Sequence, residues 1–402
     1  MDNNLRGVPV EGFADKSREA AVEGIVLLKN ENNTLPLTEQ DKVSVFGRPM
    51  IEYYRSGTGS GGAVNVEYAT NILDGFENSN LNFNKTIVED YKEWLKDHPF
   101  DNGGGGWACE PWFQKDMEIT ADYAKKQAES TNKAVYIIGR TAGEDKDNAN
   151  WVGSYLLTDE EKENLKNITE AFEDVCVVLN VSNIIDLKWI DEEQFKGHIK
   201  SVIIVWQGGM EGGNAVADAL SGKATPSGKL PDTVAYDIED YPANDNFGNE
   251  LTNLYKEDIY VGYRYFETFA KDKVKYPFGF GLSYTKFQTE ILGFSVQGMA
   301  VTAVAKVTNV GGVSGRETVQ LYLEAPQGKL GKPLRQLAAF AKTEELKPGE
   351  TEELLLKTEL TEYASYDDSG VTGHKSCYVL EEGCYRIYAG TSSRDLEQVT
   401  VD

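Results

Sequence analysis

The chain has few cysteines and few histidines among its 402 residues, and this scarcity limits the chemistry that it can carry. The four cysteines form no Cys-x-x-Cys pair and the three histidines lie far apart, so we expect no metal site and no metal cofactor. Cys176 lies in an apolar run that is typical of a core position. Cys377 and Cys384 are close enough in sequence to bridge a hairpin in an oxidising compartment.

Basic side chains are also scarce, because 40 Lys and Arg stand against 65 Asp and Glu, for a formal charge of −25. Such a surplus of negative charge repels phosphate backbones and anionic membrane surfaces, which attract proteins through lysine and arginine. We therefore expect neither a nucleic acid nor a membrane as a partner. A neutral ligand is compatible with this charge.

Long apolar runs are missing as well, since none reaches the roughly 18 residues that a membrane-spanning helix needs. The first residues, MDNNLRGVPVEG, also lack the basic, apolar and small-residue order of a signal peptide. From these features we expect a soluble cytoplasmic protein.

Apolar side chains are nevertheless plentiful, at 40% of the chain with 11% aromatic residues, which indicates a folded protein of two or three domains. Short apolar runs, each bounded by Gly, Asn or Asp, are typical of strands buried on both faces. They cover residues 43–46, 134–138, 175–181 and 202–206.

Helical patterns alternate with these strands. An opening helix is predicted over residues 17–28, and Thr158 with Glu161 matches a capping box at the start of a later helix. The other predicted helices cover residues 88–97, 117–130, 158–172 and 211–221. The alternation predicts an α/β domain over residues 1–240, with a largely parallel sheet covered by helices.

The second half of the chain has a different pattern. Residues 241–284 are rich in Tyr, Asn, Asp and Gly without helical periodicity, and we interpret them as an ordered connector. Residues 285–402 then predict an all-β, immunoglobulin-like sandwich, because short alternating strands are separated by turn signals. These strands are expected at residues 301–308, 318–323, 352–356 and 385–388.

A glycine-rich segment, residues 56–62 with the sequence SGTGSGG, formally contains the Gly-x-Gly-x-x-Gly pattern of nucleotide sites. In such sites the glycines directly follow the first strand and open the next helix, whereas here about ten residues intervene after the strand at 43–46. We expect no nucleotide cofactor. The alternative is a close-approach loop at the carboxyl edge of the sheet, where ligands gather in open α/β folds.

Two tryptophans, Trp107 and Trp112, lie in a loop that begins with four consecutive glycines. The loop has too little periodicity for ordinary core residues. The two aromatic rings either stack on a sugar or pack against neighbouring parts of the protein.

Glu144 is the candidate catalytic carboxylate. It lies in the loop GRTAGEDKDN directly after the apolar run at 134–138, so it should emerge at the carboxyl end of a strand. Its acidic neighbours are equally compatible with a solvated loop. Glycosidases use a second carboxylate as well, and no other acidic residue in the sequence has comparable standing.

Three long motifs in order resemble glycoside hydrolase family 3, the β-glucosidase family. They are WQGGMEGGNAVADALSGKATPSGKLPDT from residue 206, YKEDIYVGYRYF from residue 255 and YPFGFGLSY from residue 276. Residues 304–349 resemble the fibronectin type III-like domain of that family. The resemblance covers nearly the whole chain.

The resemblance implies that Glu144, within Gly143-Glu144, is the general acid/base, and that Gly59, Ser60 and Trp107 line or border the active-site mouth. Family members carry their Asp nucleophile on a TIM-like barrel, commonly before a Trp, but none of the six tryptophans here follows an Asp. About 250 residues, the usual size of such a barrel, are also missing. The nucleophile is therefore expected on a barrel outside this chain.

The expected function is one part of a retaining β-glucosidase-type hydrolase that acts on a β-linked glucoside or related oligosaccharide. The barrel would be supplied by the full-length protein or by a second polypeptide. A non-catalytic carbohydrate-binding or scaffold protein is the alternative. Since the face that meets the barrel would be uncovered, association with a second copy or another partner is also expected.

Overall fold

The computed structural model describes residues 10–399 except 63, 80, 196 and 250. The chain divides into two compact units. The first unit comprises Met1–Gly228 with Gly281–Tyr284, and the second comprises Lys229–Phe280 with Thr285–Asp402.

The first unit is built on a six-stranded sheet with the strand order β1-β6-β5-β4-β2-β3. Its strands are β1 (Val26–Asn30), β2 (Lys42–Phe46), β3 (Asn82–Phe83), β4 (Lys133–Gly139), β5 (Val175–Asn180) and β6 (Ile199–Ile204). The strands from β6 to β3 pair in parallel, and only β1 runs antiparallel to its neighbour. All residues of β5 are buried, as its apolar run predicts. The predicted largely parallel sheet is confirmed.

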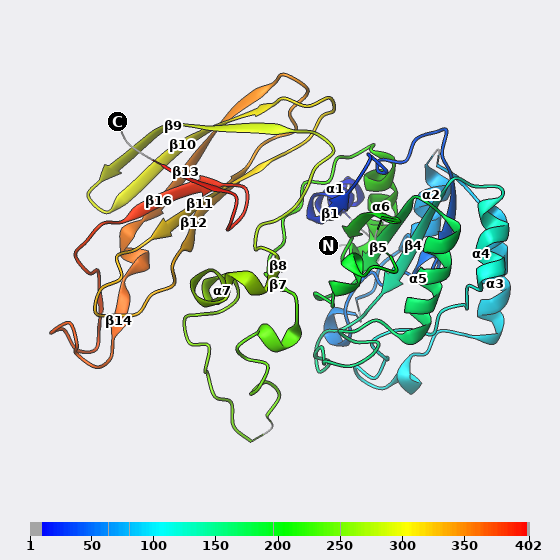
Figure 1. The fold of residues 1–402 in the computed structure, drawn as a ribbon, viewed down its shortest axis with the longest axis horizontal. Helices are drawn as coiled ribbons and strands as arrows, with labels where there is room; N and C mark the ends of the chain where they lie inside the picture. The colour runs from blue at the N-terminus through cyan, green and yellow to red at the C-terminus, as the bar shows by residue number, and fades with distance from the viewer. Residues whose placement is uncertain (1–9, 63, 80, 196, 250, 400–402) are drawn as a thin grey trace. The chain divides into compact units, whose positions relative to one another are not determined.

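Helices flank this sheet (Figure 1). They are α1 (Phe13–Gly24), α2 (Ile72–Asn78), α3 (Lys85–Asp97), α4 (Ala121–Ala128), α5 (Asp159–Ala171) and α6 (Gly212–Ser221). Helices α1 and α2 both pack against α6, and α4 packs against α5. The capping box predicted for Thr158 is present, since its Oγ1 accepts the Glu161 backbone N–H at 3.0 Å.

The predicted opening helix over residues 17–28 is wrong in its second half. Helix α1 ends at Gly24, and Val26–Asn30 form β1, which pairs with β6. Val26 and Leu27 are completely buried in this sheet. The run IVLL has apolar residues at every position, so periodicity alone did not separate a buried strand from the end of a helix.

The second unit contains the predicted antiparallel β-sandwich. One sheet joins β9 (Phe287–Gln297), β10 (Ala300–Asn309) and β13 (Thr351–Glu359) in the order β13-β10-β9. The other has the order β12-β11-β16-β17, from β11 (Thr318–Glu324), β12 (Gln336–Lys342), β16 (Arg386–Gly390) and β17 (Leu396–Gln398). Strand β10 alternates half-buried and buried residues, and its buried side chains join those of β11 and β13 in the sandwich core.

The segment before the sandwich contains a helix that the sequence did not predict. Strands β7 (Val234–Ala235) and β8 (Val274–Tyr276) pair with each other, and α7 (Tyr263–Phe269) lies between them in sequence. Phe266 of α7 is buried with Ala235 and Val274. Helix α7 has only seven residues, which is too short for a clear helical period.

A further hairpin of this unit, β14 (Ser365–Asp367) with β15 (Cys377–Val379), holds one of the two cysteines that could have bridged. Cys377 and Cys384 are both exposed and unpaired in the structure.

None of the helices in the described part of the chain combines the length and the apolar character of a membrane span.

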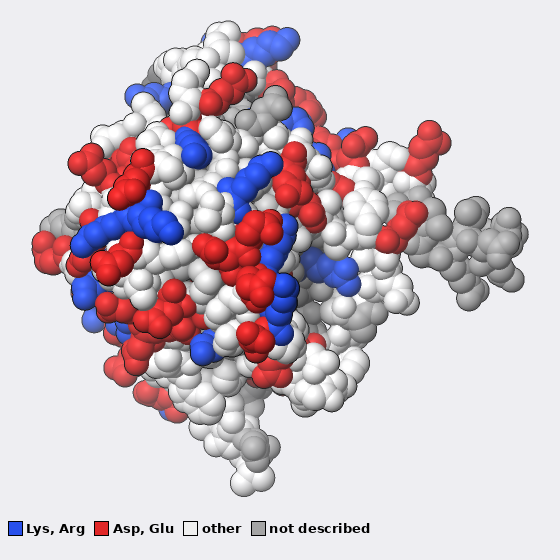
Figure 2. Space-filling view, turned by 90° about the vertical axis from the view of Figure 1, so that its right-hand side faces the viewer, with Lys and Arg blue, Asp and Glu red and all other residues white. Residues whose placement is uncertain are grey.

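Charged side chains of both signs are interspersed on the face shown in Figure 2. On α3 this arises from ion pairs one helical turn apart, Lys92 with Glu89 and Lys96 with Glu93. Acidic neighbours thus accompany the basic side chains of this helix.

Candidate functional site

Two loops meet at the carboxyl edge of the parallel sheet because β2 and β4 are neighbouring strands. The first loop, residues 56–62, follows β2, and the second, residues 140–147, follows β4. We call them the glycine loop and the acidic loop. The Thr58 N–H donates to the Ala142 carbonyl at 3.1 Å, and Thr58 forms a parallel bridge with Gly143. The two loops therefore form one structural unit.

Glycines make this close approach possible. A Cβ on Gly57 would lie 2.6 Å from the Ala142 carbonyl oxygen, and a Cβ on Gly143 would lie 2.7 Å from the Thr58 nitrogen. Gly59 has a φ of +76°, and a Cβ there would lie 2.5 Å from the Glu144 Cβ. The glycines thus let the two loops pack closely, as the close-approach alternative predicts. They do not open a long helix as in a nucleotide site, because Gly59–Gly61 form a short 3₁₀ helix and α2 begins only at Ile72.

Glu144 lies at the tip of the acidic loop with its side chain exposed. Its Oε2 accepts the backbone N–H of Ser60 at 2.9 Å. Hydrogen bonds from the Ser60 side chain and from this N–H favour the ionised form and lower the pKa of Glu144 below its ordinary value. Glu144 is therefore held against the glycine loop as a carboxylate.

Residues 103–112, which we call the tryptophan loop, pack against the acidic loop. The indole Nε1 of Trp107 donates to the Asp145 carboxylate at 3.0 Å, while 56% of Trp107 stays exposed. The Nε1 of Trp112 donates to the Asp147 carbonyl at 2.9 Å, and the Lys146 ammonium lies 4.9 Å from the centre of the Trp112 ring. Packing accounts for Trp112, whereas Trp107 keeps much of its surface free for a ligand.

A buried ion pair anchors the start of the acidic loop. Arg140, the residue after β4, makes two hydrogen bonds of 2.5 Å to the Glu161 carboxylate. Glu161 also accepts the Thr158 N–H at 2.8 Å within the capping box of α5. This double use of one carboxylate ties the acidic loop to the first turn of α5.

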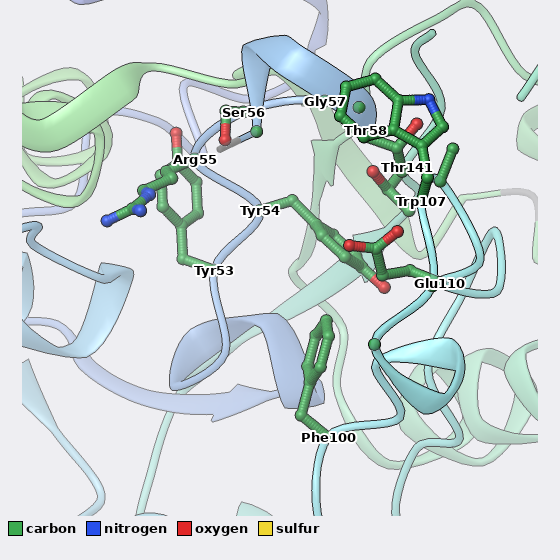
Figure 3. A pocket seen from close by; sticks show the side chains of 15 residues that line it. Tyr53, Tyr54, Arg55, Ser56, Gly57, Thr58, Phe100, Trp107, Glu110 and Thr141 are labelled. Atoms are coloured by element: carbon green, nitrogen blue, oxygen red, sulfur yellow. The ribbon is translucent and has the colours of Figure 1, made fainter. Parts of the chain in front are cut away.

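A cavity of about 510 Å³ opens between the glycine loop and the tryptophan loop (Figure 3). Gly59 and Trp107 line it, together with Tyr54, Phe100 and Glu110. Glu110 was not singled out from the sequence, where the two flanking tryptophans were the notable feature of this loop. Glu110 stands out from the other acidic residues because it lines this cavity, and the sequence gives no sign of that position.

The structure thus brings the predicted site residues together. Ser60 contacts Glu144 directly, Gly59 lies against the Glu144 side chain, and Trp107 reaches the same loop through Asp145. Among the residues that the structure describes, no group of three or more His, Cys, Asp or Glu side chains could hold a metal ion.

Comparison with known proteins identifies relatives of this chain. Residues 25–284 match the glycosyl hydrolase family 3 C-terminal domain, and residues 317–393 match a fibronectin type III-like domain. A β-glucosidase from Ruminococcus albus is 47% identical over 96% of this chain, which spans 40% of that protein. A β-glucosidase A from Butyrivibrio fibrisolvens is 38% identical over 98% of this chain, which spans 51% of that protein.

Solved structures agree with these matches. A β-glucosidase from Paenibacillus barengoltzii superposes with a TM-score of 0.97 at 57% identity, over 98% of this chain and 43% of that one. The β-glucosidase 3B of Thermotoga neapolitana, solved with α-D-glucose, gives 0.86 at 34% identity, over 96% of this chain and 53% of that one.

The chain therefore spans about half or less of the relatives that it matches. It corresponds to their α/β and fibronectin-like portions, and the described residues form no TIM-like barrel. The resemblance seen in the sequence motifs is confirmed, and the chain belongs to glycoside hydrolase family 3.

Proposed function

We propose that this chain supplies the general acid/base of a retaining β-glucosidase-type hydrolase, and that Glu144 is that group. The observation that supports this most strongly is the exposed Glu144 carboxylate, held by Ser60 at the carboxyl edge of a parallel sheet. This edge is where ligands of open α/β folds bind. In this proposal the nucleophile is an Asp on a barrel that this chain lacks.

The proposed reaction uses Glu144 twice. It first donates a proton to the glycosidic oxygen while the barrel Asp attacks the sugar and forms a glycosyl-enzyme. The Glu144 carboxylate then removes a proton from water, which hydrolyses that intermediate. The two carboxyl groups must lie about 5 to 5.5 Å apart for this outcome.

The first step needs Glu144 in its protonated form, which the present surroundings disfavour. The hydrogen bonds from Ser60 lower the pKa of Glu144 in this chain. Burial beneath a barrel and the nearby charge of the Asp would both raise it. The proton donor is thus completed only when the barrel covers the acidic loop.

The proposed substrate is a β-linked glucoside or related oligosaccharide, in line with the β-glucosidase relatives. Gly59, Ser60 and Trp107 border the site in this proposal, and the exposed face of Trp107 suits stacking against a sugar ring. No cofactor takes part in the proposed reaction.

The test mixes this chain with the barrel domain of a family relative and compares Glu144→Gln with the unchanged chain. Loss of acid/base catalysis should lower cellobiose hydrolysis by roughly 100- to 10,000-fold. For an aryl glucoside whose leaving group needs no proton, the rate of the first step should decrease less in Glu144→Gln. Azide needs no general base, so it should restore turnover of that aryl glucoside.

The matched control is Glu118→Gln, which changes an exposed glutamate outside the site. Cellobiose hydrolysis by this control should equal that of the unchanged chain. An undiminished rate for Glu144→Gln in an active mixture would refute the assignment.

The second candidate is a non-catalytic carbohydrate-binding protein, which the exposed Trp107 beside an open cavity favours. It predicts saturable sugar binding but no hydrolysis, even when the barrel is supplied. The same mixture therefore separates the two functions.

A further inference from the structure

The tip of the acidic loop is a tight turn, and Glu144 is one of its central residues. The Gly143 N–H donates to the Lys146 carbonyl at 3.2 Å, and the Lys146 N–H donates to the Gly143 carbonyl at 3.1 Å. Asp145, the third residue of this turn, has a φ of +58°, in the left-handed region. Turns that need a positive φ at their third residue favour glycine or asparagine there. The backbone alone therefore does not explain an aspartate at this position.

The Asp145 side chain has a partner outside the turn. Its Oδ2 accepts the indole N–H of Trp107 at 3.0 Å. Ala108, the residue after Trp107, also has a left-handed backbone, with a φ of +50°. Such a backbone is uncommon for residues other than glycine, and alanine has no polar side chain to stabilise it locally. Strained residues thus lie at both ends of this hydrogen bond, and strain of this kind clusters at active sites.

Other contacts attach the tryptophan loop to the two ends of the acidic loop. The Thr141 N–H donates to the Trp112 carbonyl at 2.8 Å, and the Trp112 Nε1 donates to the Asp147 carbonyl at 2.9 Å. Both bonds use backbone atoms of the acidic loop. The two loops are therefore joined without the Asp145 carboxylate, whose contact acts elsewhere.

The contact of Asp145 with Trp107 reaches the turn itself, one residue from Glu144. From the opposite direction along the chain, the Ser60 N–H donates to the Glu144 Oε2 at 2.9 Å. The glycine loop thus holds the carboxylate of Glu144, and the tryptophan loop holds the residue beside it. A turn that lost the second contact would let the carboxylate move away from Ser60.

We propose that Asp145 is a positioning residue for Glu144. The hydrogen bond from Trp107 fixes the turn, and the turn keeps the Glu144 carboxylate against Ser60. A proton donor must be held in a defined geometry to act efficiently, since a misplacement of about 1 Å can cost roughly 100-fold in rate. This inference rests on the proposed function for the catalytic role of Glu144, but the contact itself belongs to this chain.

The first experiment uses the whole chain without a barrel and measures the pKa of Glu144 by ¹³C NMR titration of the side-chain carboxyls. Trp107→Phe keeps an aromatic ring and removes the N–H donor. The turn should then loosen, and the pKa of Glu144 should rise toward its ordinary value because the Ser60 donors are lost. A ring that served only for packing would leave this pKa unchanged.

Two substitutions of Asp145 separate its hydrogen bond from its charge. Asp145→Asn and Asp145→Gly both remove the charge and both tolerate a left-handed backbone, but only asparagine keeps an acceptor oxygen. The pKa of Glu144 should therefore be higher in Asp145→Gly than in Asp145→Asn. Asp147→Ala is the matched control, because the carbonyl and not the carboxylate of Asp147 accepts the Trp112 N–H. It should not raise the pKa of Glu144.

The second experiment adds the barrel domain of a relative. Asp145→Gly should lower kcat for cellobiose by roughly 10- to 100-fold with little change in KM, because the proton donor is misplaced while the sugar contacts remain. Asp145→Asn should recover most of this loss. Hydrolysis of an aryl glucoside whose leaving group needs no proton should decrease less in its first step.

An unchanged pKa of Glu144 in Trp107→Phe overturns the proposal. Should that variant fail to fold, equal pKa values in Asp145→Gly and Asp145→Asn overturn it instead. An undiminished kcat for Asp145→Gly, in a mixture where Glu144→Gln is inactive, also overturns it. If the pKa shifts appeared while Glu144→Gln kept full activity, the contact would stand and the proposed function would fail alone.

Discussion

At the scale of single residues, hydrogen bonds from Ser60 lower the pKa of Glu144. Two donors of one residue, its hydroxyl and its backbone N–H, face an exposed carboxylate. Because the pKa of Glu144 is lower in the folded chain, this contact stabilises the folded chain at pH values above the ordinary carboxyl pKa. The stabilisation is lost as the pH falls through the lowered value.

Ser60→Ala should therefore raise the pKa of Glu144 toward its ordinary value, because the hydroxyl donor is lost while the backbone N–H remains. The pKa is measured by ¹³C NMR titration of the side-chain carboxyls, with Glu144→Gln to identify the signal. Other glutamates serve as internal controls. An unchanged pKa in Ser60→Ala would show that the hydroxyl does not contact the carboxylate.

Asp116 carries the opposite shift in the core of the first unit. Burial raises the pKa of Asp116 to about 7. This happens although its Oδ1 accepts two backbone N–H groups, those of Arg48 at 2.9 Å and Met117 at 2.8 Å. The unfolded chain releases this proton near pH 4, whereas the folded chain keeps it until about pH 7. The folded state thus binds more protons, and its stability falls as the pH rises across that range.

Asp116→Asn should remove this pH dependence, since the amide oxygen can accept the same two N–H groups without a buried charge. Urea unfolding at pH 5 and pH 8 measures the effect. From pH 5 to pH 8, the free energy of unfolding should decrease more for the unchanged chain than for the variant. Equal losses in both proteins would contradict the assignment.

At the scale of elements, the glycine loop is shaped by its contact with the acidic loop. Gly59 needs a left-handed φ and leaves no space for a Cβ beside Glu144. Gly61 lies in the same 3₁₀ helix, but nothing lies within 4 Å of its Cβ position and its φ is not in that region.

Gly59→Ala should destabilise the protein by about 1 to 3 kcal/mol, because the backbone is strained and the Cβ collides with Glu144. Gly61→Ala is the matched control and should change the free energy of unfolding by less than about 0.5 kcal/mol. Chemical denaturation measures both. If the two variants were equally stable, the close approach would not constrain the loop.

Elements also show where local pattern is sufficient. Strands β2, β4, β5 and β6 and the capping box of α5 follow from apolar runs and from the Thr158 to Glu161 spacing. Strand β1 and helix α7 do not. A buried run such as IVLL carries no period, and the register of β1 depends on the distant strand β6.

At the scale of the whole molecule, the chain spans only part of its relatives, and the proposed reaction is divided accordingly. The chain alone should release no glucose from 4-nitrophenyl β-D-glucoside at an enzyme-like rate, because the proposed nucleophile lies on the barrel. Adding the barrel domain of a relative should restore hydrolysis. Release of sugar by the purified chain alone, at a rate comparable to the mixture, would contradict this division.

The sequence by itself determined the α/β and β-sandwich classes, the family and the position of Glu144 after a strand. These depend on local burial patterns and on contiguous motifs. Only the tertiary structure decided that the glycine loop lies against Glu144, that Ser60 lowers its pKa, and that Glu110 faces a cavity. The contacts of Ser60 and Gly59 with Glu144 join residues that are 84 and 85 positions apart, so they depend on strand order and loop packing, which no local pattern encodes.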